Sequence, residues 1–174
     1  MSKGNVQAKF RCLGIEKTWD NIEVVRLQAV HAGKNGVQSE ENKAFWKASP
    51  NGEFTLRITN PESQGKMESS EYYYLDFRED VPGHMKDLGD QVLTVAMVVD
   101  YVGKYRSGQT EVRMNPCHGT WDAENKKTIP HPINGKIWLE WVNAEFKMSI
   151  DNPTACDKFS PGDYLWIELR KSPE

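Results

Sequence analysis

Residues Asn51 to Phe77 read NGEFTLRITNPESQGKMESSEYYYLDF, and residues Asn143 to Leu169 read NAEFKMSIDNPTACDKFSPGDYLWIEL. The two stretches align without a gap, and the ungapped match extends back to Asn42 and Asn134. Identical pairs include Trp46 and Trp138, Asn51 and Asn143, Phe54 and Phe146, Ile58 and Ile150, Asn60-Pro61 and Asn152-Pro153, and Tyr72 and Tyr164. A period of roughly 90 residues suits a small domain and is too long for a solenoid unit. The sequence therefore predicts a tandem duplication.

The match continues upstream when a short shift is allowed, because residues 25–31 align with residues 112–118. The second copy then carries about five extra residues before the ungapped part, an insertion of the kind that loops tolerate. Residues 78–90 read REDVPGHMKDLGD and combine charge, proline and glycine without apolar periodicity. We therefore expect a first β repeat over residues 1–80 and a second over residues 91–174, joined by this linker.

Alternation of apolar and polar residues indicates β-strands over most of the chain. It is clearest at Val6 to Lys17, at Ile22 to Val30 and at Tyr72 to Phe77. Each copy has room for about five strands, which is typical of a small barrel or sandwich. The sequence thus predicts an all-β protein, a tandem duplication of a small five-stranded barrel or sandwich, with an OB-like barrel among the options.

One segment, residues 39–46, is ambiguous. Ser39 followed by two glutamates is a pattern that caps a helix. The matching residues 134–142 begin with Asn-Gly and continue as a strand-like run rich in Ile, Trp and Val. We therefore predict a strand over Ala44 to Ser49, preceded by at most one helical turn.

The final strands of the two copies have an inner and an outer face. The inner, buried face is predicted to hold Tyr73, Leu75, Phe77, Leu165, Ile167 and Leu169. The outer face carries an aromatic pair beside a carboxylate in each copy, namely Tyr72, Tyr74 and Asp76, and Tyr164, Trp166 and Glu168. The four aromatic rings either cover the seam between the copies or lie under long loops. Alternatively, they form a contact surface for another protein or a stacking platform for bases.

Base stacking requires cations nearby to neutralise phosphates. The candidates for contact with single-stranded nucleic acid are Lys9, Arg11, Arg26, Arg57 and Arg113. They are scattered among acids, and the net charge of the chain is −3. A charged face on solvated strands is therefore the simpler interpretation.

Catalytic and metal-binding patterns are weak. The sequence contains no nucleophile elbow, P-loop, Rossmann glycine motif or His-Glu-x-x-His. His31 and His118 match across the copies, but Cys117 and His118 would point to opposite faces of one strand and could not easily share an ion. The cysteines, an odd count of three, favour free thiols in a reducing compartment. We predict a protein without enzymatic activity, cofactor or metal, and the absence of a signal peptide or an apolar span predicts no membrane partner.

Several short motifs in the first half occur together, namely Ala8-Lys9-Phe10, Thr18-Trp19-Asp20, Ser39-Glu40-Glu41-Asn42-Lys43, Ser49-Pro50-Asn51-Gly52 and Tyr72-Tyr73-Tyr74-Leu75-Asp76-Phe77. As a set, they resemble a group of short uncharacterised proteins encoded in tailed-bacteriophage genomes, each of which reads like one copy of this repeat. The resemblance covers about residues 6–78, and the second copy keeps only the hairpin and the final strand. It implies a phage origin and a β-rich module, without an activity or site residues.

Three functions are compatible with these observations. The first is a non-catalytic phage structural or accessory protein, such as a capsid-decorating or assembly module that binds a phage or host protein or its own copies. The second is a single-stranded nucleic-acid-binding protein of tandem OB-like barrels. The third is an inhibitor of a host enzyme or defence system. Each hypothesis places the chain in the host cytoplasm during infection, and the first also places it in the virion.

Overall fold

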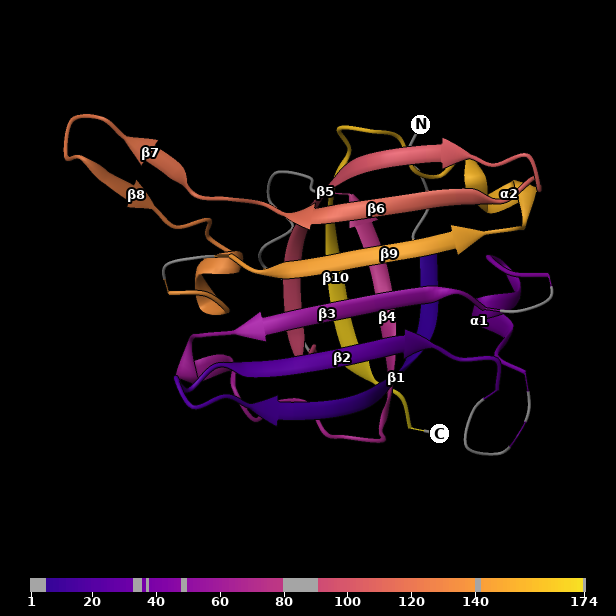
Figure 1. The fold of residues 1–174 in the computed structure, drawn as a ribbon, viewed down its shortest axis with the longest axis horizontal. Helices are drawn as coiled ribbons and strands as arrows, with labels where there is room; N and C mark the ends of the chain where they lie inside the picture. The colour runs from indigo at the N-terminus through magenta and orange to yellow at the C-terminus, as the bar shows by residue number, and fades with distance from the viewer. Residues whose placement is uncertain are drawn as a thin grey trace.

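The computed structural model describes residues 6–32, 36, 38–47, 50–79, 91–139 and 142–173. This part of the chain is all-β, and its eight long strands close one antiparallel barrel (Figure 1). The first half contributes β1 (Val6–Lys17), β2 (Glu23–Ala29), β3 (Gly52–Ile58) and β4 (Tyr72–Glu79). The second half contributes β5 (Leu93–Lys104), β6 (Thr110–Pro116), β9 (Ala144–Ile150) and β10 (Tyr164–Lys171). A separate hairpin consists of β7 (Thr120–Asp122) and β8 (Lys127–Ile129).

Neighbouring strands around the barrel follow the order β1-β2-β3-β9-β6-β5-β10-β4. The two halves therefore meet at two seams, where β3 pairs with β9 and β4 pairs with β10. Phe54 faces Phe146 at the first seam and Asp76 faces Glu168 at the second. These are matching positions of the two copies, so both registers are symmetric about them.

This architecture differs from the prediction of a five-stranded barrel or sandwich in each copy. Each half supplies four strands, and its two outermost strands pair with those of the other half. Unpaired strand edges promote association with other chains, and closure of the shared barrel removes them. Of the expected linker, residues 78 and 79 end β4, and residues 80–90 lie outside the described residues.

Aromatic side chains fill the interior of the barrel. The ring centroid of Phe146 lies 5.5 Å from that of Phe54 and 5.4 Å from that of Phe77, both in edge-to-face geometry. Phe10 is also completely buried and packs on Phe146 from the opposite wall, with the centroids 6.1 Å apart. An eight-stranded barrel is just wide enough for side chains to fill it. The two halves thus share one hydrophobic core.

Several residues that the two copies share bind across the seams. The indole of Trp46 donates to the carbonyl of Ser149, and that of Trp138 donates to the carbonyl of Arg57. Backbone hydrogen bonds repeat the same symmetry. The Asn60 amide donates to the Ile137 carbonyl at 2.9 Å, and the Asn152 amide donates to the Phe45 carbonyl at 3.0 Å. Each copy therefore presents its shared residues to the other copy.

The predicted strand over Ala44 to Ser49 is wrong at residues 44–47, which form a turn instead, while residues 48 and 49 lie outside the described residues. The one helical turn expected before it is present as α1 (Glu40–Lys43). Asn42 explains the helix, because its buried amide accepts from Lys9 N at 2.6 Å and donates to Lys9 O and Val30 O at 2.8 and 2.6 Å. A compact turn points this side chain at the main chain of β1, which an extended strand would not do.

The second copy builds the same contact with Asn134, at the start of the short helix η3 (Asn134–Lys136). Its amide accepts from Ala96 N at 2.7 Å and donates to Ala96 O and Cys117 O at 2.8 and 3.0 Å. Of the strand-like run after Asn134, residues 135–139 therefore also form a helix and turn. We refer to Asn42 and Asn134 as the asparagine latches.

The barrel has two ends, which lie at the left and right of Figure 1. The left end, called the hairpin end, carries the β1–β2 turn, the short helix η1 (Pro61–Ser63), η3 and the projecting β7–β8 hairpin. The right end, called the opposite end, carries the β5–β6 turn, α1 and the short helix α2 (Pro153–Cys156). None of the described helices is long and apolar enough to span a lipid bilayer.

Candidate binding surface

The predicted faces of the final strands are partly confirmed. All six residues assigned to the inner face are buried, with exposed fractions of 5% or less. The aromatic residues of the outer face are covered to different extents. Tyr72 is 9% exposed and Trp166 is 4% exposed, Tyr74 is half-buried, and Tyr164 is 60% exposed. The four rings therefore do not present one open platform.

Different neighbours cover the two aromatic pairs. In the first half, the Lys9 ammonium lies 5.7 Å from the ring centroid of Tyr72 and 5.5 Å from that of Tyr74, within cation–π range. In the second half, Ala96 takes the place of Lys9, and Trp166 packs with Ala96 in a small apolar cluster outside the barrel. The remaining members of that cluster are Cys117 and Ile133, with Val98 at its border.

The two carboxylates of the outer face form ion pairs across the second seam. Arg170 Nε lies 2.7 Å from Asp76 Oδ2, and Arg78 Nε lies 2.9 Å from Glu168 Oε2. Both carboxylates are buried, and burial raises the pKa of Glu168 against the opposing effect of Arg78. The ion pairs lie between the two aromatic pairs along β4 and β10. This face joins the halves of the barrel.

The five candidate nucleic-acid contacts are not brought together. Lys9 and Arg11 lie on the outer face of β1, Lys9 is 3% exposed, and the Arg11 guanidinium lies 5.8 Å from the Tyr72 ring centroid. The other three lie on β2, β3 and β6, and two of them have acidic partners. Arg26 is 3.5 Å from Glu16, Arg113 pairs with Glu111, and Arg57 donates to the Asn143 side chain at 3.4 Å. These cations do not form a continuous basic groove.

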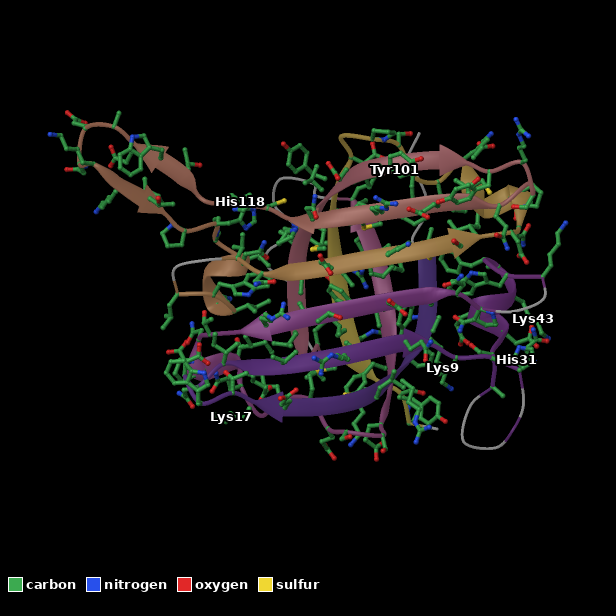
Figure 2. All side chains as sticks on the ribbon, in the orientation of Figure 1. Lys9, Lys17, His31, Lys43, Tyr101 and His118 are labelled. Carbon is green, nitrogen blue, oxygen red and sulfur yellow. The ribbon has the colours of Figure 1, made fainter. Side chains whose placement is uncertain are left out.

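The described cysteines and histidines do not form a metal-binding group either. Cys12, Cys117 and Cys156 are free and buried, and burial raises the pKa of the Cys12 thiol. His31 and His118 are exposed at opposite ends of the barrel (Figure 2). Among the described residues, no group of three or more His, Cys, Asp or Glu side chains is arranged to hold a metal ion.

Large apolar side chains are exposed at the hairpin end. Trp19, on the β1–β2 turn, is 98% exposed, and Leu139, just after η3, is 59% exposed. On the hairpin, Trp121 is 62% exposed, and Ile129, on the other face of the hairpin, is 49% exposed. Large exposed apolar residues gathered at one end of a fold mark a candidate interaction site. We call Trp19, Leu139 and Trp121 the Leu139 surface.

Two hollows flank Leu139. The turn-side hollow, of about 470 Å³, lies between Leu139 and the β1–β2 turn and is lined by Asp20, Asn21, Ile22, Arg57, Thr59, Pro61 and Asn143. The hairpin-side hollow, of about 520 Å³, lies between Leu139 and the β7–β8 hairpin, with His118, Trp121, Thr128, Pro130, His131 and Trp138 among its walls. Both volumes fall in the range of ligand sites.

The hairpin is positioned by its base and its turn. A side chain at position 119 would meet the Ile129 carbonyl oxygen at 2.2 Å, so only glycine allows the two strands to approach there. At the tip, the Asp122 carboxylate accepts from the backbone amides of Glu124 and Asn125 at 3.0 and 3.2 Å. Trp121 is paired with Thr128, and both face the hairpin-side hollow.

The opposite end differs at the equivalent positions. The β5–β6 turn has the hydrogen bonding of the β1–β2 turn but carries Arg106 where the first turn carries Trp19, and Gln109 where it carries Ile22. Lys47 stands at the position that corresponds to Leu139. The apolar character of the hairpin end is therefore not a requirement of the fold.

Sequence reasoning missed the Leu139 surface. It treated the residues inserted before Asn134 as a loop and gave Trp19 no role. One signal was available, because the repeat alignment places apolar residues of one copy against charged residues of the other. The chain matches no protein-family model and no curated protein sequence.

Proposed function

We propose that the chain is a non-catalytic protein-binding module, an accessory or structural protein of a tailed bacteriophage. Its partner is a phage or host protein, which it contacts with the Leu139 surface. The observation that carries the proposal is the difference between the two ends of the barrel. At the hairpin end, Trp19 and Leu139 are exposed, while at the other end the same backbone positions carry Arg106 and Lys47.

The chemistry of these side chains favours a protein partner. Exposed tryptophan supplies a large, rigid area with one donor, and it is enriched among the residues that dominate protein interfaces. The scattered and paired cations do not favour nucleic acid, since non-specific binding depends on many phosphate contacts. The phage assignment rests on the sequence resemblance over residues 6–78.

The test uses variants suggested by the pseudo-symmetry. Trp19→Arg and Leu139→Lys install the residues of the opposite end, so the backbone is expected to tolerate them. The tagged full chain is expressed during phage infection, retained proteins are identified, and the affinity of the purified partner is measured for each variant. We expect each substitution to weaken binding at least tenfold, or by about 1.4 kcal/mol.

Arg106→Ala and Lys47→Ala are the matched controls at the opposite end, and their affinities should equal that of the original chain. Quantification of the chain in purified virions separates a particle component from a host-directed inhibitor. Equal binding by the original chain and both hairpin-end variants would contradict the proposal. A labelled oligonucleotide retained at low salt and released steeply with added salt would instead support nucleic-acid binding.

A further inference from the structure

The side chains that line the hairpin-side hollow do not fill it. Trp121 lines this hollow from the hairpin and Trp138 lines it from the segment that follows η3, yet Trp121 remains 62% exposed. The floor is fixed, because Trp138 is 2% exposed and its indole donates to the Arg57 carbonyl. The hollow is therefore lined by one exposed indole, Trp121, and by one buried indole, Trp138, whose N–H is already hydrogen-bonded.

The described residues that line the hollow are uncharged apart from histidine. Eleven described residues line it, and none is Asp, Glu, Lys or Arg. Since 27% of the chain is charged, about three such residues would be expected by chance. The turn-side hollow, in contrast, includes Asp20 and Arg57. The hairpin-side hollow therefore suits an uncharged group.

The polar groups of the lining indicate further which class of ligand the hollow could bind. The side-chain amide of Asn134 already makes three hydrogen bonds to the main chain. His131 Nδ1 accepts from the amides of Ile133 and Asn134 at 3.2 and 3.4 Å, which in the neutral ring places the proton on Nε2. A saccharide requires several free polar side chains and a nucleotide requires cations for its phosphate. Besides Asn134, the polar side chains of the described lining are those of His118, Thr128 and His131, and the described lining contains no Lys or Arg.

A peptide segment fits better, because the hairpin also provides main-chain edges. Among the described strands, β7 and β8 pair only with each other, and each is three residues long. Their outer edges carry backbone donors and acceptors that no other described strand pairs with, the arrangement that binds an extended segment by strand addition. A hairpin this short is marginal alone and gains stability from a third strand.

We propose that the hairpin-side hollow binds an extended, uncharged segment of the protein partner and takes one of its aromatic side chains between Trp121 and the floor formed by Trp138. This inference rests on the proposed function, since it assigns part of the Leu139 surface to one feature of the same partner. Trp121 covers the bound ring and Trp138 supports it, while Pro130 and Leu139 form the walls.

The test titrates the full chain, labelled with ¹⁵N, with capped pentapeptides that differ only at the central residue. The probes are Ac-Gly-Gly-Trp-Gly-Gly-NH₂ and the versions with Phe, Glu or Lys at the centre. The indole N–H resonance of Trp121, assigned by its absence in Trp121→Phe, reports binding. We expect the Trp and Phe peptides to shift this resonance saturably at millimolar concentration, and the Glu and Lys peptides to leave it unchanged.

Variants exclude indirect effects. The backbone amides of Gly119 and Thr128 report binding to the variants that lack the indole. Trp121→Phe should retain binding of the aromatic peptides, and Trp121→Ala should lose it at least tenfold. Trp19→Ala, outside the hollow, should bind like the original chain. Absence of a saturable shift, equal shifts with the charged peptides, or full binding by Trp121→Ala would each overturn the inference.

Measurements with the whole partner separate the two proposals. If the partner loses affinity on Trp19→Arg and keeps it on Trp121→Ala, the proposed function stands and this inference fails. If the aromatic peptides bind but Trp19→Arg and Leu139→Lys leave the affinity for the partner unchanged, the inference about the hairpin-side hollow is supported. The proposal that the Leu139 surface contacts the partner is then contradicted.

Discussion

At the hairpin end of the barrel, the β1–β2 turn carries the almost fully exposed indole of Trp19. At the opposite end, the equivalent β5–β6 turn carries Arg106 next to Tyr105, whose hydroxyl is hydrogen-bonded to a carboxylate. That carboxylate belongs to Glu111, which accepts from the Tyr105 hydroxyl and from Arg113. The backbone hydrogen bonds of the two turns correspond, with Thr18 N donating to Ile22 O at 2.9 Å and Tyr105 N donating to Gln109 O at 2.8 Å. The fold thus fixes the path of the chain at both ends and leaves the exposed side chains free to differ.

The outer faces of the barrel wall show a second, compensated difference. Lys9 covers Tyr74 in the first half, and the matching residues in the second half are Ala96 and Trp166. The smaller Ala96 leaves room for the larger indole, which is buried against Ile133. A cation over a ring has been replaced by apolar packing while the strand register is unchanged. Substitutions of this kind preserve the packing of the barrel wall, whereas the substitutions at the two ends change the exposed side chains there.

The largest effect on stability is expected in the core that the two halves of the barrel share. Phe146 is 1% exposed and contacts the rings of Phe10, Phe54 and Phe77. Phe146→Ala should lower the free energy of unfolding by about 3–5 kcal/mol, through lost burial and a cavity. Urea denaturation, followed by far-UV circular dichroism and by tryptophan fluorescence, measures this loss.

The same experiment tests whether the halves are independent. One barrel predicts that both probes report a single coincident transition, and that Phe54→Ala in the first half costs about as much as Phe146→Ala. Ile129→Ala, on the exposed hairpin, is the control and should change stability by less than about 0.5 kcal/mol. Two separate transitions, with only one moved by Phe146→Ala, would show that each half folds alone.

A smaller effect, shared by both ends, is expected at the asparagine latches. Asn42→Ala leaves the buried Lys9 amide and carbonyl without their side-chain partner, and Asn134→Ala does the same to Ala96. Each should destabilise the fold by about 1–3 kcal/mol, since a buried polar group is left unsatisfied. Thermal or urea unfolding of the two variants measures the cost at each end.

The asparagine latches have the same hydrogen-bond geometry at both ends of the barrel. Similar losses from Asn42→Ala and Asn134→Ala are expected, and Asn115→Ala, on the exposed face of β6, should leave stability unchanged within about 0.5 kcal/mol. If one latch variant were as stable as the original chain, the symmetric geometry would not reflect symmetric energetics.

Local patterns predicted the strands but not their closure into one barrel. Alternation assigned Tyr73, Leu75 and Phe77 to the core correctly, because burial of one face leaves a period of two in the sequence. Which strand pairs with β4 is decided by contacts between residues about 90 positions apart, such as Asp76 with Arg170. A single sequence contains no local signal for such pairs. The prediction therefore kept each copy separate.

The same limit explains the errors in the loops and at the site. Asn42 and the indole of Trp46 determine the turn at residues 40–47, but their partners lie on β1 and β9. Read locally, residues 39–46 favour a helix cap, and the strand was inferred from the strand-like run in the matching residues 134–142. Tertiary hydrogen bonds override that strand propensity. Trp166 was assigned to the outer face with cover by a loop left as one alternative, because alternation distinguishes inside from outside the barrel and cannot decide whether a loop packs over the outside, as Ile133 does.

The smallest effect on stability is expected from Glu111, at the opposite end. The hairpin end has no acidic residue at the equivalent position. The equivalent position there is Val24, and the Tyr105 hydroxyl, followed by Arg113 and Lys147, lowers the pKa of Glu111. A carboxyl group with a lowered pKa in the folded state contributes stability above its unfolded pKa of about 4.3 and loses that contribution as the pH falls through the folded value. Glu111→Gln should therefore lose less stability than the original chain between about pH 5 and pH 3.

Urea denaturation at a series of pH values measures this difference, and two tyrosine variants locate its origin. Tyr105→Phe removes the group that lowers the pKa of Glu111 most, so its pH dependence should move toward that of Glu111→Gln. Tyr101→Phe keeps the ring 5.1 Å from the Arg113 guanidinium and should retain the original pH dependence. Because Arg113 is half exposed, solvent weakens its ion pair, and most of the effect should follow the Tyr105 hydroxyl. Identical pH dependence in Glu111→Gln and the original chain would mean that this network distinguishes the two ends in surface chemistry and not in stability.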